Sequence, residues 1–112
     1  MQLVEADLLN SQSLIKACEG ADYIVHTASP FQTDVKRKDE SKLIKPAVNG
    51  TLAVMMAAAI AKVKKVVITS SVASIGYGHS YKRTTFSEAD WSIPENCDPY
   101  AKSKVLAEKA AW

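Results

Sequence analysis

Two short apolar runs, separated by one long apolar segment, constrain the fold of this chain more than any other feature. Residues 22–28 read Asp-Tyr-Ile-Val-His-Thr-Ala, and residues 65–71 read Lys-Val-Val-Ile-Thr-Ser-Ser. Such runs are typical of parallel strands covered on both faces. Parallel strands need a crossover connection, usually a helix, and residues 40–63 have the length and apolar pattern to form one. We therefore expect an α/β architecture with a parallel sheet.

The N-terminal segment predicts one further strand and one further helix. Residues 2–7 form a short run of the β type, and Asn10 and Ser11 then offer an N-cap. Gly20 is placed to end the helix that follows. The chain would thus begin with a strand and a helix ahead of the two apolar runs.

The C-terminal third predicts a long loop and a final helix. Residues 76–96 are polar, contain two of the four glycines and form an irregular connection, and loops of that length often carry function. Asp98 supplies a cap and Pro99 a first-turn proline for a helix over residues 100–112.

Composition narrows the function classes. The hydrophobic content of 47% is that of a globular protein, and a net charge of +2 does not indicate nucleic-acid binding. Cys18 and Cys97 are far apart and lack metal-ligand spacing, so we expect reduced thiols, no metal site and a cytoplasmic protein. The longest apolar stretch, residues 51–63, is too short to span a bilayer, and no signal peptide is recognisable. A small-molecule partner is therefore expected.

Tyr100 and Lys104 are the first candidates for chemistry. They are four residues apart on the predicted last helix, so their side chains project from one face. A lysine ammonium beside a phenol favours the ionised form, which lets a tyrosine exchange a proton near neutral pH. Carbonyl reduction needs such a proton donor while a reduced nicotinamide delivers hydride. The spacing alone arises often by chance, so it requires support from other residues.

That support comes from the hydroxyl side chains at the end of the predicted strand over residues 65–71, the third along the chain. Thr69, Ser70 and Ser71 lie where the active sites of open parallel sheets gather, at the carboxyl ends of strands. Ser71 could donate a hydrogen bond to a substrate carbonyl, with Tyr100 as acid and Lys104 as the adjacent charge. A turn-forming role for the serines is the structural alternative.

Together these residues resemble the extended short-chain dehydrogenase/reductases, in the branch that holds dihydroflavonol reductase, cinnamoyl-CoA reductase and 3β-hydroxysteroid dehydrogenase relatives. The resemblance covers nearly the whole chain. It rests on residues 6–8 (Ala-Asp-Leu), 25–30 (Val-His-Thr-Ala-Ser-Pro), 49–51 (Asn-Gly-Thr), 67–71 (Val-Ile-Thr-Ser-Ser), 88–91 (Glu-Ala-Asp-Trp) and 100–112, which begin Tyr-Ala-Lys-Ser-Lys.

The resemblance implies a Rossmann-type NAD(P)-binding domain and a set of site residues. Ser71, Tyr100 and Lys104 match the catalytic triad, and Tyr100 and Lys104 also face the cofactor. The residues matched to the rest of the cofactor site are Asp7 and Leu8 against the adenine, and Ala28 and Ser29 beside the ribose and pyrophosphate. NADP is the implied cofactor, with NAD as the alternative, and the substrate would carry a carbonyl or CH–OH group.

The family pattern also implies what this sequence lacks. Residues 1–112 correspond to the part from the third strand to the active-site helix, without the first two strands, their glycine-rich turn and the C-terminal substrate region. In the strand order 3-2-1-4-5-6, the missing strands would separate residues 2–7 from residues 22–28. We expect unpaired strand edges and predict that the 112 residues alone do not form a stable, active enzyme.

Two alternatives to a reductase remain at this point. The chain could be a catalytically inactive remnant or an interaction module that keeps the sequence without the function. The same triad also serves NAD-dependent epimerases and dehydratases, although the segment over residues 100–112 favours a reductase.

Overall fold

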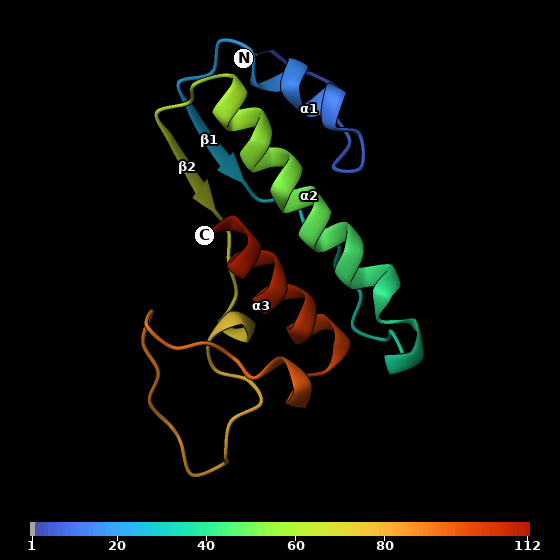
Figure 1. The fold of residues 1–112 in the computed structure, drawn as a ribbon, viewed down its shortest axis with the longest axis vertical. Helices are drawn as coiled ribbons and strands as arrows, with labels where there is room; N and C mark the ends of the chain where they lie inside the picture. The colour runs from blue at the N-terminus through green and yellow to red at the C-terminus, as the bar shows by residue number, and fades with distance from the viewer. Residues whose placement is uncertain (1) are drawn as a thin grey trace.

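A two-stranded parallel sheet and three helices form the framework of the chain. The computed structural model describes residues 2–112. Strand β1 (Tyr23–His26) pairs in parallel with β2 (Lys65–Ile68), and Tyr23 lies opposite Lys65. Helix α2 (Ser41–Ile60) connects the two strands, as Figure 1 shows. The expected α/β class, with parallel strands joined by a helical crossover, is confirmed.

Helix α2 lies at the centre of the molecule. Helix α1 (Ser11–Cys18) packs on one side of it, and the strands lie on the other (Figure 1). Leu14 and Cys18 of α1 meet Val54 and Ala57 of α2 in a buried cluster, against which Ile24 of β1 also packs. This cluster holds β1 against α2.

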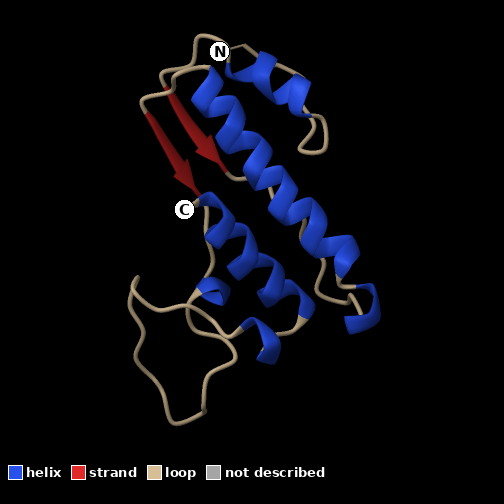
Figure 2. Cartoon of the chain, viewed as in Figure 1, coloured by secondary structure: helices blue, strands red, loops and turns tan. Residues whose placement is uncertain are grey.

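Helix α3 (Pro99–Ala111) packs alongside the N-terminal half of α2 (Figure 2). Its buried face is made of small or short side chains, of which Ala101, Ser103 and Val105 are fully buried. Small side chains allow two helix backbones to approach closely. The contact brings the half-buried face of α3 toward the carboxyl ends of the strands.

Local signals set the starts of α1 and α3 as the sequence predicts, whereas α2 ends at Ile60 rather than at residue 63. The side chain of Asn10 accepts from the backbone N–H of Ser13, and that of Asp98 accepts from Ala101. Gly20 has φ +73°, and it lies where α1 gives way to β1. At the end of α2, Lys62 takes the left-handed conformation with φ 55°, and the Val63 N–H bonds to the Ala58 carbonyl in a Schellman motif.

The predicted first strand is wrong. Residues 2–7 have no regular secondary structure and are exposed. The sheet of the described residues has only the order β1-β2, so this segment has no strand beside it with which to form a hydrogen-bonded ladder. Without such a ladder, its local β propensity is insufficient.

The strands are covered on one face only, which corrects the expectation of cover on both. Ile24, His26, Val66 and Ile68 are buried or half-buried, whereas the alternate positions, including Val25 at 68% and Val67 at 52%, are exposed. Because successive side chains of a strand point to opposite faces, this alternation leaves one whole face of the sheet open.

Helix α2 is longer than the apolar stretch recognised in the sequence. It has 20 residues, and an 18-residue window within it has a mean hydropathy of 1.5, so it is long and apolar enough to cross a membrane by length and composition alone. Core helices meet the same condition, and α2 packs against α1, α3 and β1. We therefore describe it as the core helix of this fold.

The loop between β2 and α3 is held by buried hydrogen bonds. It contains two short 3₁₀ turns, η2 (Val72–Ser74) and η3 (Pro94–Asn96). The buried Ser92 hydroxyl donates to the Ala73 carbonyl at 2.7 Å and accepts from the Tyr77 N–H at 2.8 Å. The far end of the loop is thereby tied to η2, directly after β2.

Candidate active site

Tyr100 and Lys104 lie one turn apart near the start of α3. The Lys104 ammonium is 5.5 Å from the centroid of the Tyr100 ring, and both side chains are half-buried. Phe31, in the segment after β1, meets the Tyr100 ring edge-on at 5.3 Å. The helix start, which Asp98 and Pro99 define, thus sets the phenol and the ammonium side by side, and the aromatic contact restrains the phenol.

A small cavity, here called the Lys104 cavity, opens at the carboxyl ends of both strands. Lys104 reaches it from α3, and the residues that line it with Lys104 include His26, Ala28, Ser29, Thr69, Ser70 and Ser74. The lining combines one ammonium with several hydroxyls. Such donors are of the kind that bond to ribose hydroxyls, although the cavity, at about 30 Å³, is smaller than a ribose.

The electrostatics of this cavity reflect burial. Burial lowers the pKa of Lys104 below the usual value of a lysine. Burial also lowers the pKa of His26, and the positive charge of Lys104 lowers it further. The Lys104 charge therefore disfavours the protonated form of His26 across the cavity.

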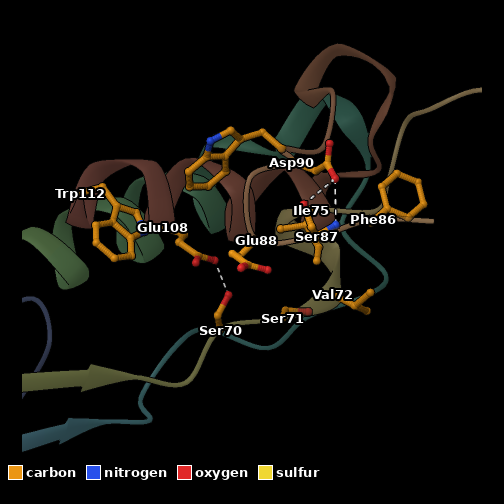
Figure 3. A pocket seen from close by; sticks show the side chains of 11 residues that line it. Ser70, Ser71, Val72, Ile75, Phe86, Ser87, Glu88, Asp90, Glu108 and Trp112 are labelled. Carbon is orange, nitrogen blue, oxygen red and sulfur yellow. Dashed lines mark hydrogen bonds between the residues drawn. The ribbon is translucent and has the colours of Figure 1, made fainter.

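Ser71 lies at the junction of β2 and η2 and faces a second depression, here called the Ser71 groove. Its side chain caps η2 by accepting from the Ala73 N–H at 3.2 Å. The groove is also lined by Phe86, Asp90 and Trp112, as Figure 3 shows. Ser71 does not line the Lys104 cavity, whereas Ser70 and Glu108 line both depressions.

Sequence reasoning did not identify Glu108 or Phe31 as parts of this region. Glu108 accepts a hydrogen bond from the Ser70 hydroxyl, and Figure 3 shows this contact between α3 and the segment after β2. Its spacing was a usable signal, because Glu108 follows Lys104 by four residues and so lies on the same helix face. Phe31 follows the Ser-Pro pair that ends the strand run and carries no comparable pattern.

Asp7 and Leu8 lie away from both depressions. Asp7 accepts from the Leu9 N–H at 2.9 Å and lines a surface cavity formed by the N-terminal segment and α1. Leu8 packs against Gly50 of α2, where a Cβ on the glycine would lie 3.2 Å from the Leu8 Cβ. Ala28 and Ser29, in contrast, are both at the Lys104 cavity. The cofactor roles of these four residues remain predictions.

Comparison with known proteins places this arrangement in a family. The model of the 3-beta hydroxysteroid dehydrogenase/isomerase family matches residues 1–111. Cinnamoyl-CoA reductase 1 of Petunia hybrida is 41% identical over 117 residues, covering 100% of this chain and 34% of the relative. Bifunctional dihydroflavonol 4-reductase/flavanone 4-reductase of Pyrus communis is 34% identical, covering 100% of this chain and 34% of the relative.

A solved structure shows the same fold. The crystal structure of gox2253 superposes with a TM-score of 0.75 and 28% sequence identity, and covers 93% of this chain and 31% of that chain. The chain therefore spans about a third of the length of the relatives that it matches. With a family model that matches nearly every residue, the chain belongs to the 3-beta hydroxysteroid dehydrogenase/isomerase family.

Proposed function

We propose that this chain carries the catalytic residues of an NAD(P)-dependent oxidoreductase that reduces a carbonyl group or oxidises the matching CH–OH group, in the manner of a dihydroflavonol reductase. The single observation that carries the proposal is the placement of the Lys104 ammonium, 5.5 Å from the Tyr100 ring centroid and in a cavity at the strand ends. The similarity to reductases of cinnamoyl-CoA and dihydroflavonols supports the same chemistry.

The residues divide the work as follows. A bound reduced nicotinamide supplies the hydride. Tyr100 gives a proton to the substrate oxygen, and the adjacent Lys104 charge favours the phenolate left behind and binds the ribose hydroxyls. Ser71 donates a hydrogen bond to the same substrate oxygen, where negative charge develops during the reaction. Asp7, Leu8, Ala28 and Ser29 are proposed to contact the rest of the cofactor.

The proposal extends to cofactor and setting. We favour NADP over NAD, with a small carbonyl compound or alcohol as substrate and without nucleic acid or membrane as partner. Cys18 and Cys97 are both free and buried, which fits a reducing compartment such as the cytoplasm.

The Tyr100→Phe substitution tests the proposal in the polypeptide that the full open reading frame encodes. Oxidation of NADPH is followed with a panel of carbonyl compounds that includes a cinnamoyl-CoA and a dihydroflavonol. We expect kcat to fall by about 10²–10⁴-fold, because general acid catalysis contributes that much. The dissociation constant for NADPH, measured by nucleotide fluorescence, should change by less than about twofold, because only a hydroxyl is removed.

Tyr23→Phe is the matched control, since Tyr23 lies at the exposed start of β1. It should keep the turnover of the unsubstituted protein. Equal turnover in Tyr100→Phe and Tyr23→Phe would refute the assignment of the proton donor. A lack of turnover by the unsubstituted polypeptide with either nucleotide would instead favour the inactive remnant.

A further inference from the structure

Glu108 and the two serines after β2 carry an inference that rests on the proposed function. We infer that Glu108 is a positioning residue: it takes the single proton of the Ser70 hydroxyl, and so leaves Ser71 as the strand-end hydroxyl that donates to the substrate. Ser70 and Ser71 are neighbours with the same side chain, so the sequence alone does not show which of them donates to the substrate oxygen.

The contact between Ser70 and Glu108 engages the Ser70 proton. The Ser70 hydroxyl donates to Oε2 of Glu108, and a hydroxyl has only one proton to donate. The Ser70 Oγ also lies 3.4 Å from the Oγ of Ser74, and Ser74 is only 1% exposed. A carboxylate is a stronger acceptor than a neutral carbonyl, so a substrate oxygen would not displace Glu108 from this proton.

Ser71 has the opposite arrangement. Its Oγ accepts from the Ala73 N–H at 3.2 Å, and this bond uses a lone pair rather than the proton. The Ser71 carbonyl accepts from the Ser74 N–H at 2.9 Å, which holds the residue at the start of η2. The hydroxyl proton of Ser71 is therefore available at the groove that its side chain lines.

Helix α3 carries both Glu108 and the proposed acid, Tyr100. Tyr100, Lys104 and Glu108 follow each other at intervals of four residues, and all three are half-buried on the same face of α3. One rigid element therefore carries the proton donor, the cation and the acceptor that holds the end of β2. Loss of the Glu108 carboxylate would leave the Ser70 proton without this acceptor. Residues 70–74 would then no longer be held in place relative to Tyr100.

A double-mutant cycle on the polypeptide encoded by the full open reading frame tests the inference. Ser70→Ala and Glu108→Ala should each lower kcat by about tenfold through misplacement of the strand end. The double variant should also lose about tenfold, because both substitutions remove the same contact. Ser71→Ala should lose about 100-fold as a direct donor to the substrate oxygen.

Conservative variants separate positioning from a general structural role. Glu108→Gln should keep most of kcat, because its amide oxygen still accepts from Ser70. Glu95→Ala, which removes an exposed carboxylate from η3, is the control for loss of charge. The inference is overturned if Ser70→Ala lowers kcat as much as Ser71→Ala does, or if either Ser70→Ala or Glu108→Ala leaves kcat unchanged. It is also overturned if the two losses of kcat multiply to about 100-fold in the double variant.

Hydrogen exchange distinguishes a failure of the inference from a failure of the proposed function. The amides of Ser74, Ile75 and Gly76 are bonded to carbonyls of residues 71 and 72. Glu108→Ala should raise their exchange rates by about tenfold, since it releases this segment from α3, while Glu95→Ala should not. This result is readable even if the unsubstituted polypeptide shows no turnover. Unchanged exchange in Glu108→Ala would overturn the inference.

Discussion

Lys102 and Lys104 of α3 are both half-buried but have different surroundings. Lys102, two positions earlier, forms an ion pair with Glu40 at 2.7 Å, whereas Lys104 reaches into the cavity beside His26. An ammonium that is partly removed from water is less stable in its protonated form, which is why its pKa falls. The same charge disfavours protonation of His26.

Titration of His26 checks this proximity at the scale of single residues. Followed by the NMR signal of the imidazole Cε1–H, the pKa of His26 should lie below 6.5, and Lys104→Met should move it upward toward that value. In this variant the pKa of His26 should still lie below 6.5, because burial is the larger cause of its lowering. Lys102→Met is the control and should leave the titration unchanged. Equal titration curves in the two variants would contradict the placement of Lys104.

The same depressed pKa of His26 defines a pH dependence of stability. Well above pH 6.5 the imidazole is neutral in both the folded and the unfolded chain, so its titration does not change the free energy of unfolding. As pH falls through 6.5, the unfolded chain binds the proton first, and the folded state loses stability until the pH is below the folded pKa. In the polypeptide of the full open reading frame, His26→Asn should therefore reduce the decline of the urea midpoint between neutral and acidic pH. A decline as steep as that of the unsubstituted protein would exclude His26 as its cause.

At the scale of elements, the loop after β2 depends on one close approach of two backbone segments. Gly78 has φ +79°, and a Cβ built there would lie 2.6 Å from the Ile93 carbonyl oxygen. The Gly78 carbonyl in turn accepts from the Asn96 side chain at 2.9 Å. A side chain at this position would separate the two arms of the loop, which the Ser92 hydroxyl ties to η2.

Two glycines in the left-handed region allow this approach to be tested. Gly78→Ala should lower the free energy of unfolding by more than about 2 kcal/mol, since it adds a clash to the cost of about 1 kcal/mol for a left-handed alanine. Gly20→Ala, with φ +73° and open space around its would-be Cβ, should cost only the conformational part. Urea unfolding curves of both variants, made in the polypeptide of the full open reading frame, give the comparison. Equal losses would show that the backbone contact at Gly78 is not made.

At the scale of the whole molecule, the chain exposes more surface than a compact protein of its size. The solvent-accessible area is 7688 Å² for a mass of 12.1 kDa, while folded monomers of that mass expose about 6,000 Å². The radius of gyration of 15.2 Å likewise exceeds the value of about 13 Å expected for this length. The open sheet face with Val25 and Val67 is part of this excess.

We therefore predict that residues 1–112, expressed alone, do not form a stable, active enzyme. Unpaired outer edges of β1 and β2 and an exposed apolar face favour association over a compact monomer. Thermal unfolding followed by circular dichroism should be broad, light scattering should show oligomers, and NADPH oxidation should be absent. The polypeptide of the full open reading frame is the reference. A cooperative transition of a monomer, together with nicotinamide-dependent turnover, would disprove the prediction.

The sequence by itself determined the features that depend on neighbouring residues. The Asn10 and Asp98 caps, the left-handed Gly20 and the four-residue spacing of Tyr100 and Lys104 arise within one turn of chain, so pattern is sufficient to predict them. The parallel pairing of β1 and β2 was also predictable, because a long helix between two apolar runs permits few other arrangements.

Only the tertiary structure decided the features that depend on distant partners. Residues 2–7 are not a strand because no described strand lies beside them, and pattern cannot supply a partner. In the same way, Ser70 and Ser71 are neighbours of identical chemistry in the sequence. They differ in the structure because Glu108, 38 residues beyond Ser70, engages the proton of the first and leaves that of the second free.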